Sequence, residues 1–392
     1  MNVVIHPDHS LRARITQAAA LLLAMAAVFG AARRVIALDS KVPAEERAKI
    51  EDAVKKFMAA QSVPGLSAAV VQNGEFSWSE GFGMADLENS VPASPQTLYR
   101  LGSVSKPLTA TGAMLLWERG KLDLDAPVQK YCPAFPPKDA PITTRQLLGH
   151  LGGIRHYHED VNPVDDPELG NTKHFDDPIS AGIAFFAKDA LIDKPGAHFH
   201  YSTHGYTLVG CAIEGASGEK YVAYMHEAVF APGGMAHTVV DDKYAVILNR
   251  TRFYQKDKSG RVENADFLDS SYKIPGGGWL SSADDLAQFE VDMLGDKLVK
   301  RSTRDLMWAP QTLADGSKDS YGLGWDVDNA RGISYVAHSG GQQGASTVIL
   351  IAPELRAGIV VLANIEEVEV ARLAHEILEI VAANSQAGSR SN

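Results

Sequence analysis

The segments expected to form β-strands lie at the two ends of this chain, and this placement constrains the fold more than any other feature. Near the N-terminus, the apolar run 66–71 precedes Asn73-Gly74, a dipeptide typical of two-residue hairpin turns. Apolar residues then alternate with polar ones at Phe76, Trp78 and Phe82. Near the C-terminus, four short strands are expected, at 322–327, 333–337, 347–351 and 358–362. The simplest arrangement joins both groups in one antiparallel sheet.

Helices are expected around and between these strands. Amphipathic patterns over 44–60 and 366–383 predict terminal helices, and the middle of the chain, from about 101 to 289, reads as helix and loop. The segment 160–177 is rich in Pro, Asp and Asn, which predicts a surface loop. We therefore expect an α+β fold in two parts, with an antiparallel sheet of N- and C-terminal strands, flanked by helices, and a largely helical middle region.

The composition fits one large globular domain. The chain has 392 residues, of which 45% are hydrophobic and 22% are charged. Neither an internal repeat nor a linker divides it, so we expect a single domain over 38–384 and a polar tail over 385–392.

The N-terminus carries the pattern of an export signal. Arg12 and Arg14 precede the apolar run Ala18–Phe29, and the small residues Gly30-Ala31-Ala32 follow it. We therefore expect residues 1–37 to direct export to the periplasm or outside the cell. Two alternatives stay open, namely an uncleaved segment that anchors the chain in a membrane and an organelle presequence.

The charge balance disfavours some partners. Losing residues 1–37 would remove four basic residues and one acidic residue, which takes the net charge from −11 to −14. Such an acidic chain is poorly suited to nucleic acids or to anionic membrane surfaces. The charge does not identify a substrate.

Cysteine and histidine spacing predicts neither a disulfide nor a metal centre. Cys211 lies in an apolar run and reads as core, whereas Cys132 lies in a loop, so little favours a bond between them. The histidines at 156 and 158, and those at 198, 200 and 204, lack the spacing of a zinc site and read as loop residues. We expect no cofactor.

The strongest chemical signal is Ser103-Val104-Ser105-Lys106, at the start of a helical pattern. Residues three apart share a helix face, so a hydroxyl and an amine meet there. A lysine in a desolvated pocket can lose its charge and activate the serine as a nucleophile. Two further S-x-x-K matches, 217–220 and 270–273, precede or contain helix-breaking residues and are set aside.

Two later motifs support this site. Tyr201-Ser202-Thr203 follows a Pro-Gly turn and precedes a helical run, where a phenol can serve as a base or proton relay. His338-Ser339-Gly340-Gly341 follows a predicted strand, where small residues allow a substrate to approach the backbone. Taken singly, the first motif is equally well a core tyrosine and the second a simple turn.

Together the motifs S-x-x-K, Y-S-x and H-S-G, in this order, resemble the serine β-lactamase and penicillin-binding-protein superfamily. The segments YRLGSVSKPLTATGAMLLWERGKLDLDAPV, ITTRQLLGHLGGI and PGGGWLSSADDLAQF are similar to the class C β-lactamase branch and its esterase and peptidase relatives. The resemblance extends over about 48–381. Several stretches are most similar to the mitochondrial serine β-lactamase-like proteins and their bacterial-type homologues.

The resemblance implies a role for each motif. Ser103 would be acylated, Lys106 would accept its proton, and Tyr201 would assist as a base and activate the deacylating water. The backbone N–H groups of Ser103 and Gly341 would form an oxyanion hole. The substrate would lie along a further set, His338, Ser339, Gly340 and Thr203.

Two departures from the family pattern bear on the substrate. His338 stands where β-lactamases carry a lysine, and Thr203 stands where many relatives carry an asparagine. We therefore expect a serine acyl hydrolase that acts on an ester, amide or peptide bond of a small molecule or peptide. We expect an esterase or peptidase rather than an efficient β-lactamase.

The alternative is a weakly catalytic or non-catalytic protein that self-associates, since a mitochondrial relative forms filaments. An α/β-hydrolase is disfavoured because G-x-S-x-G is absent.

Overall fold

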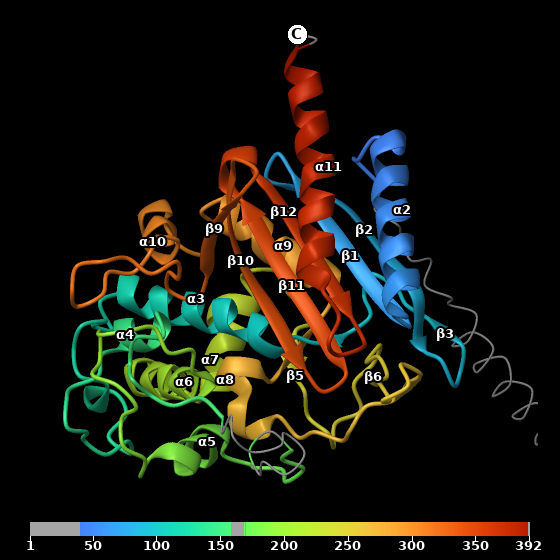
Figure 1. The fold of residues 1–392 in the computed structure, drawn as a ribbon. Helices are drawn as coiled ribbons and strands as arrows, with labels where there is room; N and C mark the ends of the chain where they lie inside the picture. Colours follow the sequence, from blue (N-terminus) through green and yellow to red (C-terminus); the bar gives the residue numbers. More distant parts are fainter. Residues whose placement is uncertain (1–39, 158–167, 169, 391–392) are drawn as a thin grey trace, which may run out of the picture. The chain divides into compact units, whose positions relative to one another are not determined.

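The computed structural model describes residues 40–157, 168 and 170–390, with the backbone alone described over 385–390 (Figure 1). The predicted signal 1–37 lies outside these residues, as does half of the predicted loop 160–177, namely 160–167 and 169. No helix among the described residues is long and apolar enough to cross a membrane.

The elements alternate along the chain much as the sequence predicts. The strands are β1 (Gly65–Gln72), β2 (Glu75–Asp86), β3 (Val91–Pro92), β4 (Tyr99–Arg100), β5 (Val239–Val240), β6 (Tyr254–Lys256), β7 (Val262–Asn264), β8 (Trp279–Ser281), β9 (Asp326–Ala330), β10 (Ile333–Gln342), β11 (Ala345–Ala352) and β12 (Ala357–Ala363). The α-helices are α2 (Ala44–Gln61), α3 (Ser105–Glu118), α4 (Thr144–Leu148), α5 (Pro178–Phe186), α6 (Thr203–Ser217), α7 (Tyr221–Met225), α8 (Ile274–Gly277), α9 (Ala283–Leu294), α10 (Arg301–Met307) and α11 (Val370–Arg390). Short 3-10 turns include η1 (Gly102–Val104), η2 (Val128–Lys130) and η4 (Ser271–Lys273).

The predicted sheet is confirmed. Seven strands run in the order β3-β2-β1-β12-β11-β10-β9, so the N-terminal strands meet the C-terminal ones where β1 pairs antiparallel with β12. Val70 lies opposite Ile359 in this pairing. The two ends of the chain therefore meet in one sheet, and the helical middle region packs against it.

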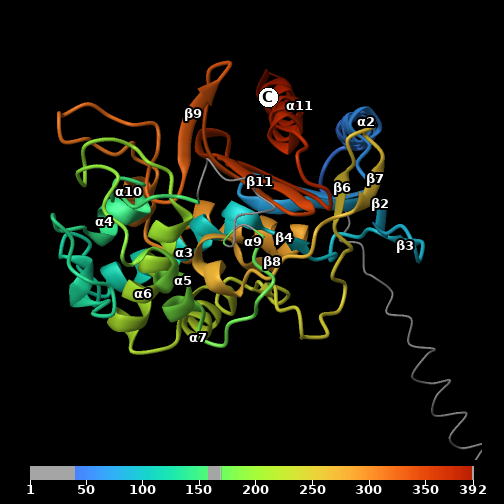
Figure 2. The ribbon, with the colours of Figure 1, turned by 60° about the horizontal axis from the view of Figure 1, so that its bottom comes forward.

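The sheet divides two apolar cores. Helices α2 and α11 cover one face, where Leu66, Val70 and Ile359 contribute side chains. The helical middle region and α9 cover the other face, which receives Val71 and Val360. Figure 2 shows these layers from below, with α2 and α11 on one side of the sheet and α3, α6 and α9 on the other. Alternation of side chains along each strand produces this division.

Element bounds differ from expectation at four places. The strand predicted at 322–327 begins only at Asp326, because Gly324 adopts φ +91° where a buried loop passes Ala110. Strand β10 continues past 337 to Gln342 and so includes the H-S-G-G motif. Helix α11 begins at Val370 and its backbone extends to Arg390, into the predicted polar tail. The segment 270–273, set aside as non-helical, forms η4 and leads directly into α8.

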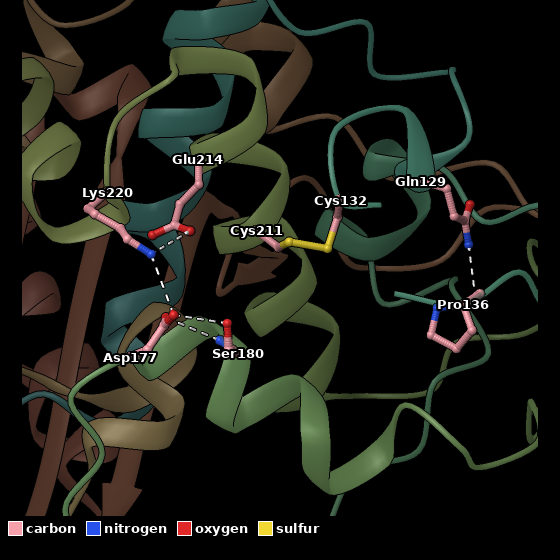
Figure 3. The surroundings of a disulfide bond; sticks show 8 residues. All are labelled: Gln129, Cys132, Pro136, Asp177, Ser180, Cys211, Glu214 and Lys220. Carbon is pink, nitrogen blue, oxygen red and sulfur yellow. Dashed lines mark hydrogen bonds and ion pairs between the residues drawn. A yellow bond between two sulfur atoms is a disulfide. The ribbon is translucent and has the colours of Figure 1, made fainter. Parts of the chain in front are cut away.

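The expectation of unpaired cysteines is wrong. Cys132, which follows η2, forms a disulfide with Cys211 of α6 (Figure 3). Their contrasting sequence settings concealed the pair, since Cys132 is as fully buried as a core residue although its segment is a loop. The bond links two parts of the helical region that are 79 residues apart in sequence.

Candidate active site

The S-x-x-K motif forms the predicted geometry. Ser103 lies in η1 and Lys106 lies in the first turn of α3, so both side chains face the same way. Lys106 Nζ is 2.9 Å from Ser103 Oγ. Ser103 is partly exposed, whereas the side chain of Lys106 is fully buried. The nucleophile can therefore meet a substrate while the amine stays away from water.

The environment of Lys106 favours its neutral form. Its Nζ also contacts Thr203 Oγ1 at 3.2 Å and the carbonyl oxygen of Gly276 at 2.9 Å. Among the described residues, no carboxylate lies within ion-pair distance of this amine. Burial, and to a lesser extent the charge of Lys273, hold the pKa of Lys106 well below its ordinary value. A neutral amine beside a serine hydroxyl can accept its proton.

Tyr201 joins the same cluster. It immediately precedes α6, whose N-cap Ser202 accepts a hydrogen bond from Gly205 N. The ring of Tyr201 lies 4.7 Å from Lys106 Nζ. Burial raises the pKa of the Tyr201 phenol well above its ordinary value, and a hydrogen bond with Ser103 opposes this only in part. The phenol is therefore protonated at neutral pH.

The H-S-G-G motif lies against the nucleophile. A Cβ atom built on Gly340 would be 2.0 Å from Leu101 O and 3.0 Å from Ser103 N, so only glycine allows this approach. A Cβ atom on Gly102, which has φ +50°, would be 3.0 Å from Gly341 N. The backbones of η1 and β10 are therefore in close contact, and the N–H groups of Ser103 and Gly341 lie on these two segments.

His338 is buried and neutral. Its Nδ1 lies 2.7 Å from Ser339 O and its Nε2 lies 2.9 Å from the hydroxyl of Tyr321. The carbonyl oxygen requires a donor, so Nδ1 carries the proton and Nε2 accepts from Tyr321. Burial, with a smaller contribution from the charge of Lys106, lowers the pKa of His338 to about 3. It is therefore no cation at neutral pH, unlike the lysine it replaces.

A groove of about 840 Å³ runs along the end of β10. Ser339, Gly340 and Gly341 line it on the sheet side, and Gly170 and Thr172 line it on the side of the helical region. Residues 366–371, which lead into α11, also line it, whereas Ser103, Lys106 and Tyr201 are not among its described lining residues. The groove therefore adjoins the backbone segment that contacts Ser103. A substrate of small-molecule or peptide size fits such a volume.

Sequence reasoning missed a second buried amine. Lys273 is 4% exposed, and among the described residues its Nζ has neither a hydrogen-bond acceptor nor an ion-pair partner. This Nζ lies 5.6 Å from the ring of Tyr157. Burial first, and then the charge of Arg100, lower the pKa of Lys273 to about 7. The signal was the third S-x-x-K match, which was set aside because Pro and Gly residues follow it.

Histidines outside the motifs support the site. His150 is buried, as expected of a core residue, and its Nδ1 accepts a hydrogen bond from Ser202 N at 3.1 Å. Its ring lies 4.3 Å from the ring of Tyr201. His156 Nδ1 accepts from Thr203 N at 3.3 Å, and burial lowers the pKa of His156 to about 3. Both rings therefore position the start of α6.

Comparison with known proteins agrees with this geometry. The sequence profile of the family described as Beta-lactamase matches residues 50–382. The human mitochondrial serine beta-lactamase-like protein LACTB is 34% identical over 379 residues, covering 74% of this chain and 69% of the relative. An octameric penicillin-binding protein homologue from Pyrococcus abyssi has a TM-score of 0.73 at 29% identity, covering 86% of this chain and 77% of the homologue. D-amino acid amidase from Ochrobactrum anthropi shares the fold, with a TM-score of 0.74 at 23% identity and coverage of 87% and 100%.

Proposed function

This chain belongs to the Beta-lactamase family, and from that premise we propose that it is a serine acyl hydrolase acting through a covalent acyl-Ser103 intermediate. The observation that carries the proposal is the 2.9 Å contact between Lys106 Nζ and Ser103 Oγ, with no carboxylate at the amine among the described residues. This arrangement supplies a nucleophile and a base without a metal or cofactor.

In the proposed acylation, neutral Lys106 takes the proton of Ser103 as Oγ attacks the substrate carbonyl carbon. The backbone N–H groups of Ser103 and Gly341 donate to the developing oxyanion. Tyr201, still protonated, gives its proton to the leaving alcohol or amine, and Lys106 returns the proton taken from Ser103 to the phenol. The bond to the leaving group breaks and the acyl group remains on Oγ.

Deacylation reverses the proton path. A water molecule loses a proton through Tyr201 to Lys106 as its oxygen attacks the acyl carbon. Lys106 then gives this proton to Ser103 Oγ as the bond between Oγ and the acyl carbon breaks, which restores the serine and the neutral amine. The raised pKa of Tyr201 makes Lys106 the stronger candidate for the base, with the phenol as relay. Because both groups interact with Ser103, a measured profile would report apparent pKa values of the pair.

Esters, amides or peptides are the substrates that we propose. His338 is neutral at pH 7, so it does not provide the charge with which a lysine would hold a carboxylate. Thr203 has a hydroxyl in place of an amide, and this hydroxyl is engaged with Lys106. Both features weaken the case for efficient hydrolysis of β-lactams and leave acyl transfer through Ser103 unaffected.

Hydrolysis of a chromogenic ester and a peptide amide by purified variants tests the proposal. Ser103→Ala should lower kcat/KM by a factor of about 10³ or more, because the covalent route is lost. Ser105→Ala is the matched control, since its buried hydroxyl has no hydrogen-bond partner among the residues that the structure describes and should be dispensable. Equal activity of Ser103→Ala and the wild type would reject the mechanism. A folded wild type that hydrolyses neither substrate would favour a non-catalytic assembly role, as the octameric relative suggests.

We further propose that the protein acts after export, in the periplasm or outside the cell. The disulfide between Cys132 and Cys211 supports this location, because such bonds persist mainly in oxidising compartments. Fractionation of cells that express the full chain would test it, and protein retained with the cytoplasmic fraction would contradict it.

A further inference from the structure

A histidine pair that sequence spacing disfavoured as a metal site meets a carboxylate in the fold. Within the described part of the chain, one nitrogen each from His198 and His200 and one carboxylate oxygen of Asp193 lie within 4.8 Å of one another. His198 Nδ1 is 2.6 Å from Asp193 Oδ2, and His200 Nε2 is 2.9 Å from the same oxygen. His204, the third histidine of the run, is elsewhere and contacts Glu168 at 2.8 Å.

Both imidazoles face Asp193, whereas the residue between them points inward. Residues 198–200 lie in an irregular segment that begins with a bend at His198. Phe199 points inward, with its ring 5.6 Å from the rings of His150 and Tyr321. His198 and His200 instead contact Asp193, which faces them across the turn that contains Gly196 at φ +86°.

Hydrogen bonds hold this turn in place, and they leave free the three atoms that would bind a metal, namely His198 Nδ1, His200 Nε2 and Asp193 Oδ2. Gly196 N donates to Leu151 O at 2.7 Å, and His200 N donates to His150 O at 2.8 Å. Asp193 Oδ1 accepts from Lys194 N at 2.7 Å, which orients the carboxylate and leaves Oδ2 toward the imidazoles. A metal ligand supported in this way needs little reorganisation on binding.

Charge and access also suit a cation. The two imidazole nitrogens and the carboxylate oxygen together offer the mixed nitrogen and oxygen ligands that zinc accepts. The side chain of His198 is 73% exposed, which leaves a path from solvent. Asp315 lies within electrostatic reach of His198, on a loop joined to the turn by Ala314 N donating to Gly196 O at 2.8 Å.

We propose that Asp193, His198 and His200 form a zinc-binding site, with Asp315 or water as the fourth ligand. Tetrahedral zinc with bonds of about 2.0–2.1 Å separates its ligand atoms by about 3.4 Å. The present nitrogen–oxygen distances of 2.6 and 2.9 Å need to widen by about 0.8 and 0.5 Å, which side-chain rotations provide. Bound zinc would lock the segment that continues directly into Tyr201, so the site would stabilise this wall of the cleft.

Zinc titration of the tag-free full chain by calorimetry tests the proposal. We expect one zinc ion per chain, binding at least tenfold more weakly to His198→Ala and to His200→Ala. Asp193→Asn, which keeps the shape but not the charge, should show the same loss. His237→Ala is the matched control, because His237 pairs with Asp285 at 3.2 Å but has no second histidine. The His237→Ala variant should bind zinc with the affinity of the wild type.

A stability readout separates metal binding from misfolding of the variants. In the presence of a chelator, the His198→Ala variant should have the wild-type melting temperature, because the His198 side chain is mostly exposed. Added zinc should raise the melting temperature of the wild type only. Absence of zinc binding to the wild type would overturn the proposal. Binding of equal affinity to the wild type and to both folded histidine variants would also overturn it.

Discussion

The charge of Lys273 helps to set the pH range in which Lys106, the proposed base, is neutral. Lys106 owes its low pKa to burial and, in smaller part, to the charge of Lys273, which is present below about pH 7. Replacing Lys273 by Met removes that charge, so the pKa of Lys106 rises and its neutral form appears only at higher pH. The acid limb of kcat/KM should therefore move upward in pH, measured from about pH 5 to about pH 9.

The matched control for this profile is Lys121→Met, at an exposed lysine. It should leave the acid limb in place. An unshifted limb in Lys273→Met, with the protein folded, would show that Lys273 does not influence the base. A lower rate without any shift would assign Lys273 a purely structural role.

Burial lowers the pKa of Lys106 but raises the pKa of a carboxyl group that packs against the sheet. Glu290 of α9 is fully buried and accepts one hydrogen bond from Leu350 N, and within the described part of the chain its Oε2 has no hydrogen-bond partner. Burial raises the pKa of Glu290 well above its ordinary value. The stability that the neutral carboxyl contributes is complete below the unfolded-state pKa, and it is lost as the pH rises toward the folded-state pKa.

Glu290→Gln should therefore gain stability relative to the wild type as the pH rises, because glutamine does not titrate. Urea unfolding at about pH 5 and about pH 8 measures the difference. Glu227→Gln, at an exposed position, should show no such trend. A Glu290→Gln difference that is the same at both pH values would contradict the assignment.

Among the elements, α6 connects the site with the disulfide. Its first turn carries Thr203, which contacts Lys106, and Cys211 two turns later is bonded to Cys132. The bond closes a long loop in the unfolded chain, so replacing both cysteines by Ala should lower the free energy of unfolding by about 2–4 kcal/mol. Denaturant titration of the double variant measures this change.

Reduction of the wild type provides the control for that experiment. Reducing agent should destabilise the wild type by a similar amount and leave the double variant unchanged. Equal stability of the wild type and the double variant under oxidising conditions would show that the bond contributes nothing.

The elements also show what the sequence could predict. Strands 66–71, 347–351 and 358–362 are confirmed because their apolar patterns match the buried centre of the sheet. The C-terminal end of strand β10 could not be predicted, because Gly340 and Gly341 are typical of a turn in sequence. In the fold these glycines continue the strand toward Ser103. Lys273 was missed because the Pro and Gly residues that follow it predict no helix. In the fold, these residues form the buried short helix α8 directly after η4.

At the scale of the whole molecule, the site assembles only when distant segments meet. Ser103 and Lys106 belong to one turn and were predictable together, whereas the contacts to Thr203 and Gly276 join residues 97 and 170 positions away. The cysteine pair and the Asp193–His198–His200 cluster likewise depend on the fold. Sequence alone therefore predicted the contact between Ser103 and Lys106 but not the electrostatic surroundings of the amine.

The central claim is that Ser103 forms a covalent acyl-enzyme intermediate. The most direct measurement is intact and peptide mass spectrometry of the purified protein after exposure to a fluorophosphonate, a chromogenic ester and a penicillin. We predict one adduct per chain from the fluorophosphonate and the ester, mapped to Ser103, with little from the penicillin and none in Ser103→Ala. A folded wild type that gains no adduct from any reagent, or an adduct on another residue, would contradict this account.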